Sequence, residues 1–95
     1  MKIADIQKIV CDECDISLTQ IVSRSRRRDW SWPRHVAMGL VREFMPEKTL
    51  AQIAIAFKRV NHTTVLHAIE HFERMKEEDG WKKKIKAARE KCLIQ

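Results

Sequence analysis

Glycine and proline are scarce in this chain of 95 residues, which has two of each. Strand-like alternation joined by turn pairs such as Asn-Gly is also absent, and the combination favours helices throughout. The two glycines, Gly39 and Gly80, cannot form the glycine-rich loop that holds the phosphates of a nucleotide. We therefore expect an all-α protein that binds no nucleotide.

Long hydrophobic runs are absent as well. No stretch approaches the roughly 20 apolar residues that cross a bilayer. Lys8 and three acidic residues interrupt the N-terminal segment MKIADIQKIVCDEC, which is therefore unlike the apolar block of a signal peptide. Apolar residues make up 44% of the chain, enough for one modest core and too few for two. We expect a single domain over residues 1–95, located in the cytoplasm and without membrane contact.

The residue patterns of disulfide-rich, metal-binding and catalytic proteins are missing too. The three cysteines, Cys11, Cys14 and Cys92, are odd in number, and Cys11 with Cys14 supplies only half of a tetrahedral zinc site. Neither paired carboxylates, nor a Ser-His-Asp spacing, nor an activated cysteine stands out. We expect free thiols, no enzyme activity, and no metal or other cofactor. Two histidines of one helix acting as metal ligands are the minor alternative.

Positive charge, by contrast, is abundant and clustered. The net charge is +6, and residues 1 to 23 hold two lysines against four acidic residues, so the rest of the chain carries +8. Clustered positive charge suits a polyanionic partner, above all nucleic acid. Its densest block is SRSRRRDWSW at residues 23 to 32, whose arginines can neutralise phosphates or enter a narrow minor groove, or are simply solvated. Trp30 and Trp32 beside them either anchor packing or stack on DNA.

Apolar residues recur at helical spacing along most of the chain. We expect helices at about residues 2–13, 18–22, 33–45, 50–57 and 81–93, and one more from the cap Asn61 to the break at Asp79-Gly80. Asp15 or Ser17 can cap the second helix and Thr49 the fourth, and Pro33 suits a first turn. Residues 50–57 are apolar on nearly all sides and should pack centrally. The expected helix at 33–45 has an apolar face, with these residues pointing elsewhere: Arg34, His35 and Arg42.

A short helix, a turn of a few residues and a longer helix with a polar first turn form a helix-turn-helix, which presents the start of its second helix to the major groove. Unpaired N–H groups and the positive dipole end at that start favour phosphates and electron-rich base edges. Asn61, His62 and Thr63 have the right length to reach base edges from there. The alternative is that they only cap and begin the helix.

Residues 23–75 resemble the C-terminal DNA-binding domain of the bacterial replication initiator DnaA. The resemblance rests on NHTTVLHA at 61–68, close to the family's Asp-His-Thr-Thr-Val-Leu-His-Ala, and on Pro33-Arg34 with Ala37-Met38 after an arginine-rich segment. It implies a small Trp-repressor-like helix-turn-helix domain whose partner is double-stranded DNA carrying a nine-base-pair DnaA box. Departures from the family are Asn61 for Asp, His35 for Gln, Ala51 for Pro, and Lys58-Arg59-Val60 in a turn usually richer in glycine.

The resemblance also implies contact residues. Asn61, His62, Thr63 and Thr64 approach the major groove, and Arg26 enters the adjacent minor groove. Further residues are expected near the DNA backbone, the groove wall or the contact face: Arg24, Arg28, Arg34, His35, Arg42, Leu50, Ala51 and His67. We expect a freestanding single-domain relative, with a fragment of a full initiator as the alternative. A transcriptional regulator, or a module that binds an initiator or helicase loader protein, is the rival function.

Overall fold

The computed structural model describes all 95 residues, which form six helices and no strand. The helices are α1 (Ile3–Cys14), α2 (Leu18–Ile21), α3 (Arg28–Phe44), α4 (Leu50–Ala56), α5 (His62–Met75) and α6 (Asp79–Leu93). The expected all-α class is confirmed. No helix combines the length and apolar character needed to span a membrane.

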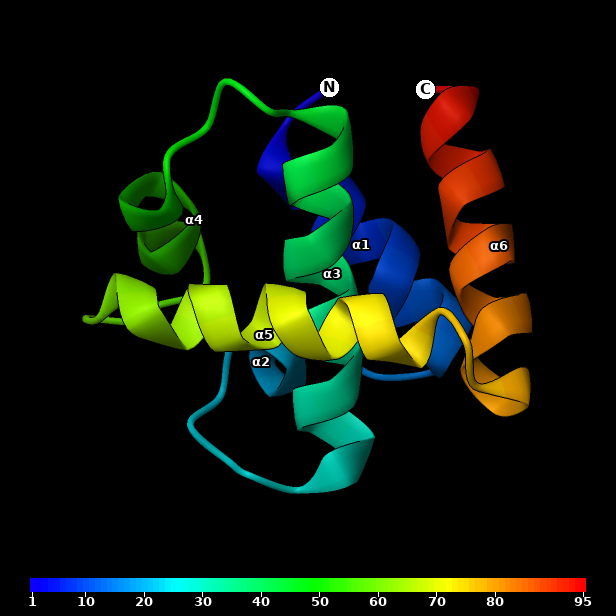
Figure 1. The fold of residues 1–95 in the computed structure, drawn as a ribbon, viewed down its shortest axis with the longest axis horizontal. Coiled ribbons are helices and arrows are strands. Elements are labelled where there is room, and N and C mark those ends of the chain that lie inside the picture. Colours follow the sequence, from blue (N-terminus) through cyan, green and yellow to red (C-terminus); the bar gives the residue numbers. More distant parts are fainter.

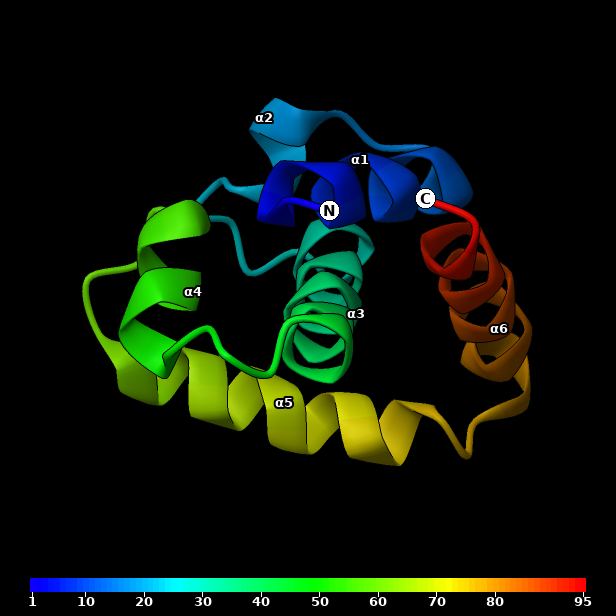
Figure 2. The same ribbon diagram turned by 90° about the horizontal axis from the view of Figure 1, so that it is seen from above.

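Helix α3 is the centre of the fold (Figure 1). α1 lies on one side of it and α5 crosses it on the other, while α4 and α6 pack on opposite flanks (Figure 2). One hydrophobic cluster of 21 buried residues joins these helices. α3 supplies the largest share, namely Val36, Ala37, Met38, Leu40 and Val41.

The crossing of α3 and α5 is close because Gly39 has no side chain. A Cβ atom built at Gly39 would lie 2.2 Å from the ring of Phe72 on α5. That distance is far inside van der Waals contact, and the Phe72 ring is fully buried and rigidly packed. Gly39 therefore sets how near the two helices lie.

Three helix starts were predicted correctly from their caps. Ser17 accepts from the Gln20 N–H (3.1 Å) and Thr49 accepts from the Gln52 N–H (3.1 Å), each in a reciprocal capping box. The Asn61 side chain likewise accepts from the Thr63 N–H at 2.8 Å. These caps are local in sequence, so residue type alone located them.

Two helices begin earlier than predicted. α3 starts at Arg28, so Pro33 lies inside the helix and not in its first turn. The extension places Trp32 against Trp81, with ring centroids 6.1 Å apart, and this packing between distant segments outweighs the weak local pattern. α6 starts at Asp79, where a carboxylate in the first turn complements the helix dipole.

The prediction that the fourth helix packs centrally was wrong. Ile53 and Ala54 of α4 are buried, but Ile55 is 73% exposed. α4 lies on a flank of the molecule and packs mainly on α5, so its outer side faces solvent. Apolar composition alone could not distinguish a flanking helix from a central one.

The replacement Gly39→Ala should lower the free energy of unfolding by about 1 to 3 kcal/mol, because overpacking against Phe72 exceeds the gain in helix propensity. The measurement is urea unfolding followed by circular dichroism. Gly80→Ala is the matched control, since no atom lies within 4 Å of its new Cβ, and it should leave stability equal or slightly higher. A Gly39→Ala protein as stable as the wild type would contradict the close crossing.

Candidate nucleic-acid interface

Helix α4, the turn after it and α5 form the expected helix-turn-helix. The chain reverses at Lys58, whose φ of 57° lies in the left-handed region. The N–H groups of Lys58 and Arg59 donate to the carbonyls of Ile55 (3.0 Å) and Ala54 (2.8 Å) and so close the end of α4. Left-handed backbone is unfavourable by roughly 1 kcal/mol for a residue other than glycine. Lys58 therefore occupies a backbone conformation that glycine would adopt without strain.

The start of α5, residues 61 to 64, is a polar tip that we call the reading tip. Its four side chains are all exposed, while Val65 immediately after it is fully buried. Asn61 Oδ1 accepts from the Thr63 N–H at 2.8 Å, so its amide N–H groups remain free. Capping and outward contact are thus compatible at Asn61, because different atoms serve each role.

Residues 22 to 27 connect α2 to α3, and we call them the basic loop. Arg24 and Arg26 are exposed and make no hydrogen bond or ion pair with the rest of the protein. Arg27 differs, because it lies over the Trp30 ring (4.8 Å to the centroid) and pairs with Asp29 (3.3 Å). Arg24 and Arg26 are therefore the loop cations whose charge is unopposed.

Arg34 does not point away from the protein as predicted. Its side chain is buried, at 5% exposure, and Nε donates to the Ile21 carbonyl at 2.6 Å. Both terminal nitrogens donate to the Ser25 carbonyl at 3.4 Å. Burial, and after it the charge of Arg59, lowers the pKa of Arg34 to about 10, so the guanidinium stays charged at neutral pH. Arg34 thus fastens the basic loop to α3 from the inside.

A second guanidinium, which the sequence analysis missed as a site residue, holds the loop from the other side. Arg59, in the helix-turn-helix turn, donates through Nη2 to the Ser23 carbonyl at 2.5 Å. Its pKa is lowered by burial and by the nearby charge of Arg24. The sequence did contain a signal, since this arginine lies in a turn where the family usually has glycine. One side chain thereby joins the basic loop to the turn that leads into the reading tip.

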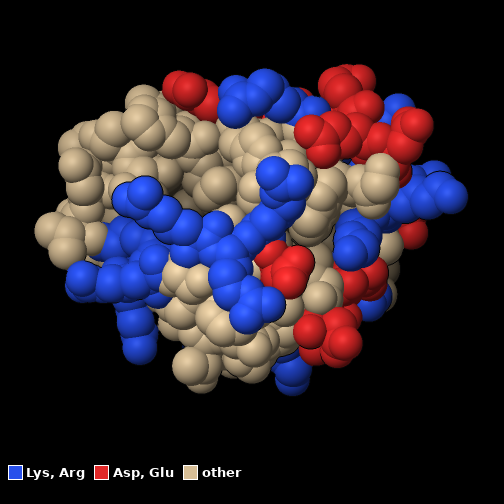
Figure 3. Space-filling view, turned by 90° about the horizontal axis from the view of Figure 1, so that it is seen from below, with Lys and Arg blue, Asp and Glu red and all other residues tan.

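Between the basic loop and the reading tip lies a hollow of about 330 Å³, which we call the cationic hollow. It is lined by Arg24, Arg34, Lys58, Arg59, Val60, Asn61 and Thr64. The fold therefore brings four predicted contact residues, from three separate segments, around one space: Arg24, Arg34, Asn61 and Thr64. None of the lining residues is acidic. Figure 3 shows Lys and Arg side chains close together on the left and in the centre of one face, while Asp and Glu lie mainly to the right and along the top, mixed with further Lys and Arg.

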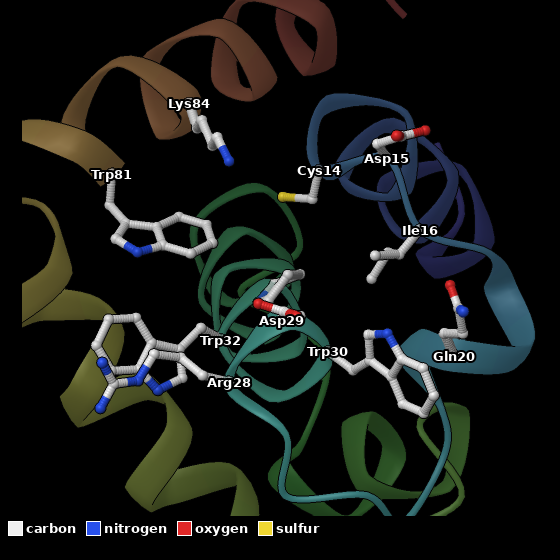
Figure 4. A pocket seen from close by; sticks show the side chains of 11 residues that line it. Cys14, Asp15, Ile16, Gln20, Arg28, Asp29, Trp30, Trp32, Trp81 and Lys84 are labelled. Atoms are coloured by element: carbon white, nitrogen blue, oxygen red, sulfur yellow. The ribbon is translucent and has the colours of Figure 1, made fainter.

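A larger hollow of about 480 Å³ lies among α1, α3 and α6 (Figure 4). Three tryptophans line it, and Arg28 is positioned over the Trp32 ring at 4.5 Å. Its wall contains two carboxylates, Asp15 and Asp29, as well as the cations Arg28 and Lys84. Trp32 also contacts the His71 ring edge to face, with centroids 4.7 Å apart, so it acts as the packing anchor that was one of the two predicted roles.

His35 was expected near the DNA backbone or the groove wall, but the structure places it in the contact between α3 and α5. Its Nδ1 lies 2.8 Å from Nδ1 of His71, so one ring donates a proton and the other accepts. Both side chains are partly buried. Burial, then repulsion by His71, Arg34 and Arg59, lowers the pKa of His35 to about 4. The imidazole is therefore neutral at physiological pH and serves the helix crossing.

The other predicted contact residues lie on the surface or at its edge. Arg28 belongs to the first turn of α3, and Arg42 is exposed near its last turn. Leu50 is half-buried and Ala51 exposed at the start of α4, while His67 is exposed one turn beyond the reading tip. All of them remain accessible to a partner.

The pair of His35 and His71 makes stability pH-dependent in a defined direction. An unfolded histidine binds its proton near pH 6.5, whereas both folded pKa values lie lower. The contribution of this pair to the free energy of unfolding is therefore complete above about pH 6.5. It is lost as the pH falls toward 4, by roughly 1 kcal/mol per pH unit. Urea unfolding between pH 7 and 4 should show a shallower decline for His35→Gln, while His62→Gln at an exposed position keeps the wild-type profile. Identical slopes for all three proteins would contradict this role.

Comparison with known proteins agrees with this geometry. Residues 3–71 match the family model described as the bacterial DnaA protein helix-turn-helix. The chain is 36% identical over 77 residues to the chromosomal replication initiator protein DnaA of Methylobacillus flagellatus, and 40% identical over 79 residues to that of Laribacter hongkongensis.

These alignments cover 81% and 83% of this chain but 16% of each relative, so the chain spans about one sixth of the length of the relatives it matches. The matched family model covers α1 to α5 up to His71, and α6 lies beyond it. The matched domain is a non-catalytic, DNA-binding module. The resemblance seen in the sequence is confirmed, and the chain belongs to the family of bacterial DnaA helix-turn-helix domains.

Proposed function

We propose that this chain binds double-stranded DNA at DnaA-box-like sites, in replication initiation or its regulation. The reading tip enters the major groove, and the basic loop reaches through Arg26 into the adjacent minor groove. One observation carries the proposal. The exposed donors at the start of α5 and the unopposed arginines of the basic loop are linked through the hydrogen bond from Arg59 to Ser23. The relatives are named chromosomal replication initiators, which supports the proposed process.

Each residue of the reading tip has a distinct role in this proposal. His62 and Thr63 read base edges, and the Thr64 hydroxyl donates to a phosphate, as Arg42 does elsewhere on the backbone. Because Asn61 Oδ1 is engaged by the Thr63 N–H, its free amide N–H groups donate to a base acceptor such as adenine N7. An aspartate at this position could only accept, so we expect a base preference different from that of relatives with aspartate.

The surrounding surface completes the contact in our proposal. Residues near the sugar-phosphate backbone or the groove wall are Arg24, Arg28, Leu50, Ala51 and His67. His35 is left out of this set because its ring nitrogen bonds inside the protein. From behind the basic loop, Arg34 fixes the backbone that carries Arg26.

Replacing Arg26 by alanine should weaken binding to a boxed duplex by roughly tenfold or more, since minor-groove insertion and a cation are lost together. Fluorescence anisotropy titrations at several salt concentrations measure this. Lys86→Ala is the matched control, because it removes one positive charge from an exposed site on α6, and its affinity should stay near that of the wild type. Binding that is insensitive to salt and equal for boxed and scrambled duplexes would instead favour a protein-interaction module.

Thr63→Ala should relax discrimination at a single base pair by about 1 to 3 kcal/mol while changing the salt dependence little. The measurement is a set of competition titrations in which each base pair of the site is varied in turn. A change spread evenly over all positions, or no change at any, would show that Thr63 does not read a base.

A further inference from the structure

We propose that the cationic hollow is an anion site that takes one phosphate group, and that Lys58 and Arg59 of the turn belong to it as ligands. The inference rests on the proposed function for the identity of the anion, a phosphodiester of bound DNA. The site itself, however, does not depend on base recognition. Its chemistry is phosphate binding by converging cations.

Unopposed charge is the first reason. Four cationic side chains, those of Arg24, Arg34, Lys58 and Arg59, line the hollow, and no carboxylate does. None of the four forms an ion pair with an acidic residue. Like charges held together in partly buried surroundings repel, and a bound anion removes that repulsion. The tryptophan-lined hollow has both signs of charge and lacks this feature.

Unused hydrogen-bond donors are the second reason. A guanidinium carries five N–H groups, and Arg59 donates through one nitrogen, Nη2, to the Ser23 carbonyl. The buried Arg34 donates through its terminal nitrogens only at the long distance of 3.4 Å. Both guanidiniums are therefore fixed in place and keep donors for an anion in the hollow that they line. Preorganised donors of this kind suit phosphate, which accepts in several directions.

The backbone at Lys58 is the third reason. Its φ of 57° is a conformation that glycine adopts freely and lysine does not. The Lys58 side chain is exposed, so no packing in the core compensates for this strain. A lysine in this position adds a fourth cation to the rim of the hollow, and an anion bound there would offset the cost of its backbone conformation.

The position of the hollow identifies the phosphate. Its wall includes Asn61 and Thr64 of the reading tip on one side and Arg24 of the basic loop on the other. In the proposed complex these two elements occupy neighbouring grooves of one duplex, and the strand between those grooves passes over the hollow. The anion is then a backbone phosphate between the major-groove and minor-groove contacts.

Inorganic phosphate tests the site without DNA. Titration into the ¹⁵N-labelled protein at constant ionic strength, balanced with chloride, should shift the Nε–Hε signals of Arg34 and Arg59 along a saturable curve. The same titration of Lys58→Ala should saturate at higher phosphate concentration, and Lys86→Ala should match the wild type. Shifts no larger than those caused by chloride would overturn the anion site, whatever the protein does with DNA.

Lys58→Gly and Lys58→Ala separate a ligand role from a turn role. Glycine relieves the strained backbone, so Lys58→Gly should unfold at a higher urea concentration than the wild type, yet bind boxed duplex several-fold more weakly. For Lys58→Gly, the slope of log affinity against log salt concentration should become shallower by about one unit. Lys58→Ala should show the same loss of affinity without the gain in stability. Wild-type affinity in both variants would overturn the assignment of Lys58.

Duplexes with a single neutral methylphosphonate in place of one phosphate locate the anion. For the wild type, one backbone position should lose more affinity than its neighbours, and that loss should nearly vanish in Lys58→Ala, whereas Lys86→Ala keeps the wild-type pattern. Losses that are equal in wild type and Lys58→Ala at every position would overturn DNA as the source of the phosphate. Failure to bind any boxed duplex, with saturable inorganic phosphate binding retained, would count against the proposed function and leave the anion site standing.

Discussion

The guanidinium of Arg34 is the constraint on which the surface of this protein depends. It is buried under the basic loop and donates to the carbonyls of Ile21 and Ser25, which would otherwise lack these partners. Arg59 repeats the arrangement from the helix-turn-helix side through the Ser23 carbonyl. Together they convert a short, arginine-rich connection into an element with a defined position beside the start of α5.

Positive charge in this chain consequently has two structural uses. Some cations are bonded to partners in the same chain, as the buried Arg34 is to backbone carbonyls and as Arg89 is to Glu43 on the surface at 3.0 Å. Others, such as Arg24 and Arg26, have no internal partner and face outward. Net charge alone indicates that an anionic partner is plausible, but it does not show which cations keep hydrogen-bond donors for that partner. The two groups cannot be separated by composition.

The sequence predicted what is decided locally. The caps Ser17, Thr49 and Asn61 and the helix-turn-helix followed from short-range chemistry and periodicity. Features decided by packing between distant segments were missed. The early start of α3, the burial of Arg34 and the contact of His35 with His71 each depend on residues at least nine positions away. A charged residue beside a basic segment gives no local sign of turning inward.

The close contact of Gly39 with Phe72 limits how far α3 and α5 can move relative to each other when this domain forms a complex. α3 is hydrogen-bonded to the basic loop, and α5 carries the reading tip. Because the two helices pack closely against each other, the distance between the two contact elements is fixed. Such a protein does not adjust its span to its partner. In the proposed complex, any mismatch between this spacing and that of the two grooves is taken up by the double helix, so sequences that deform easily are then favoured even at base pairs that no side chain touches.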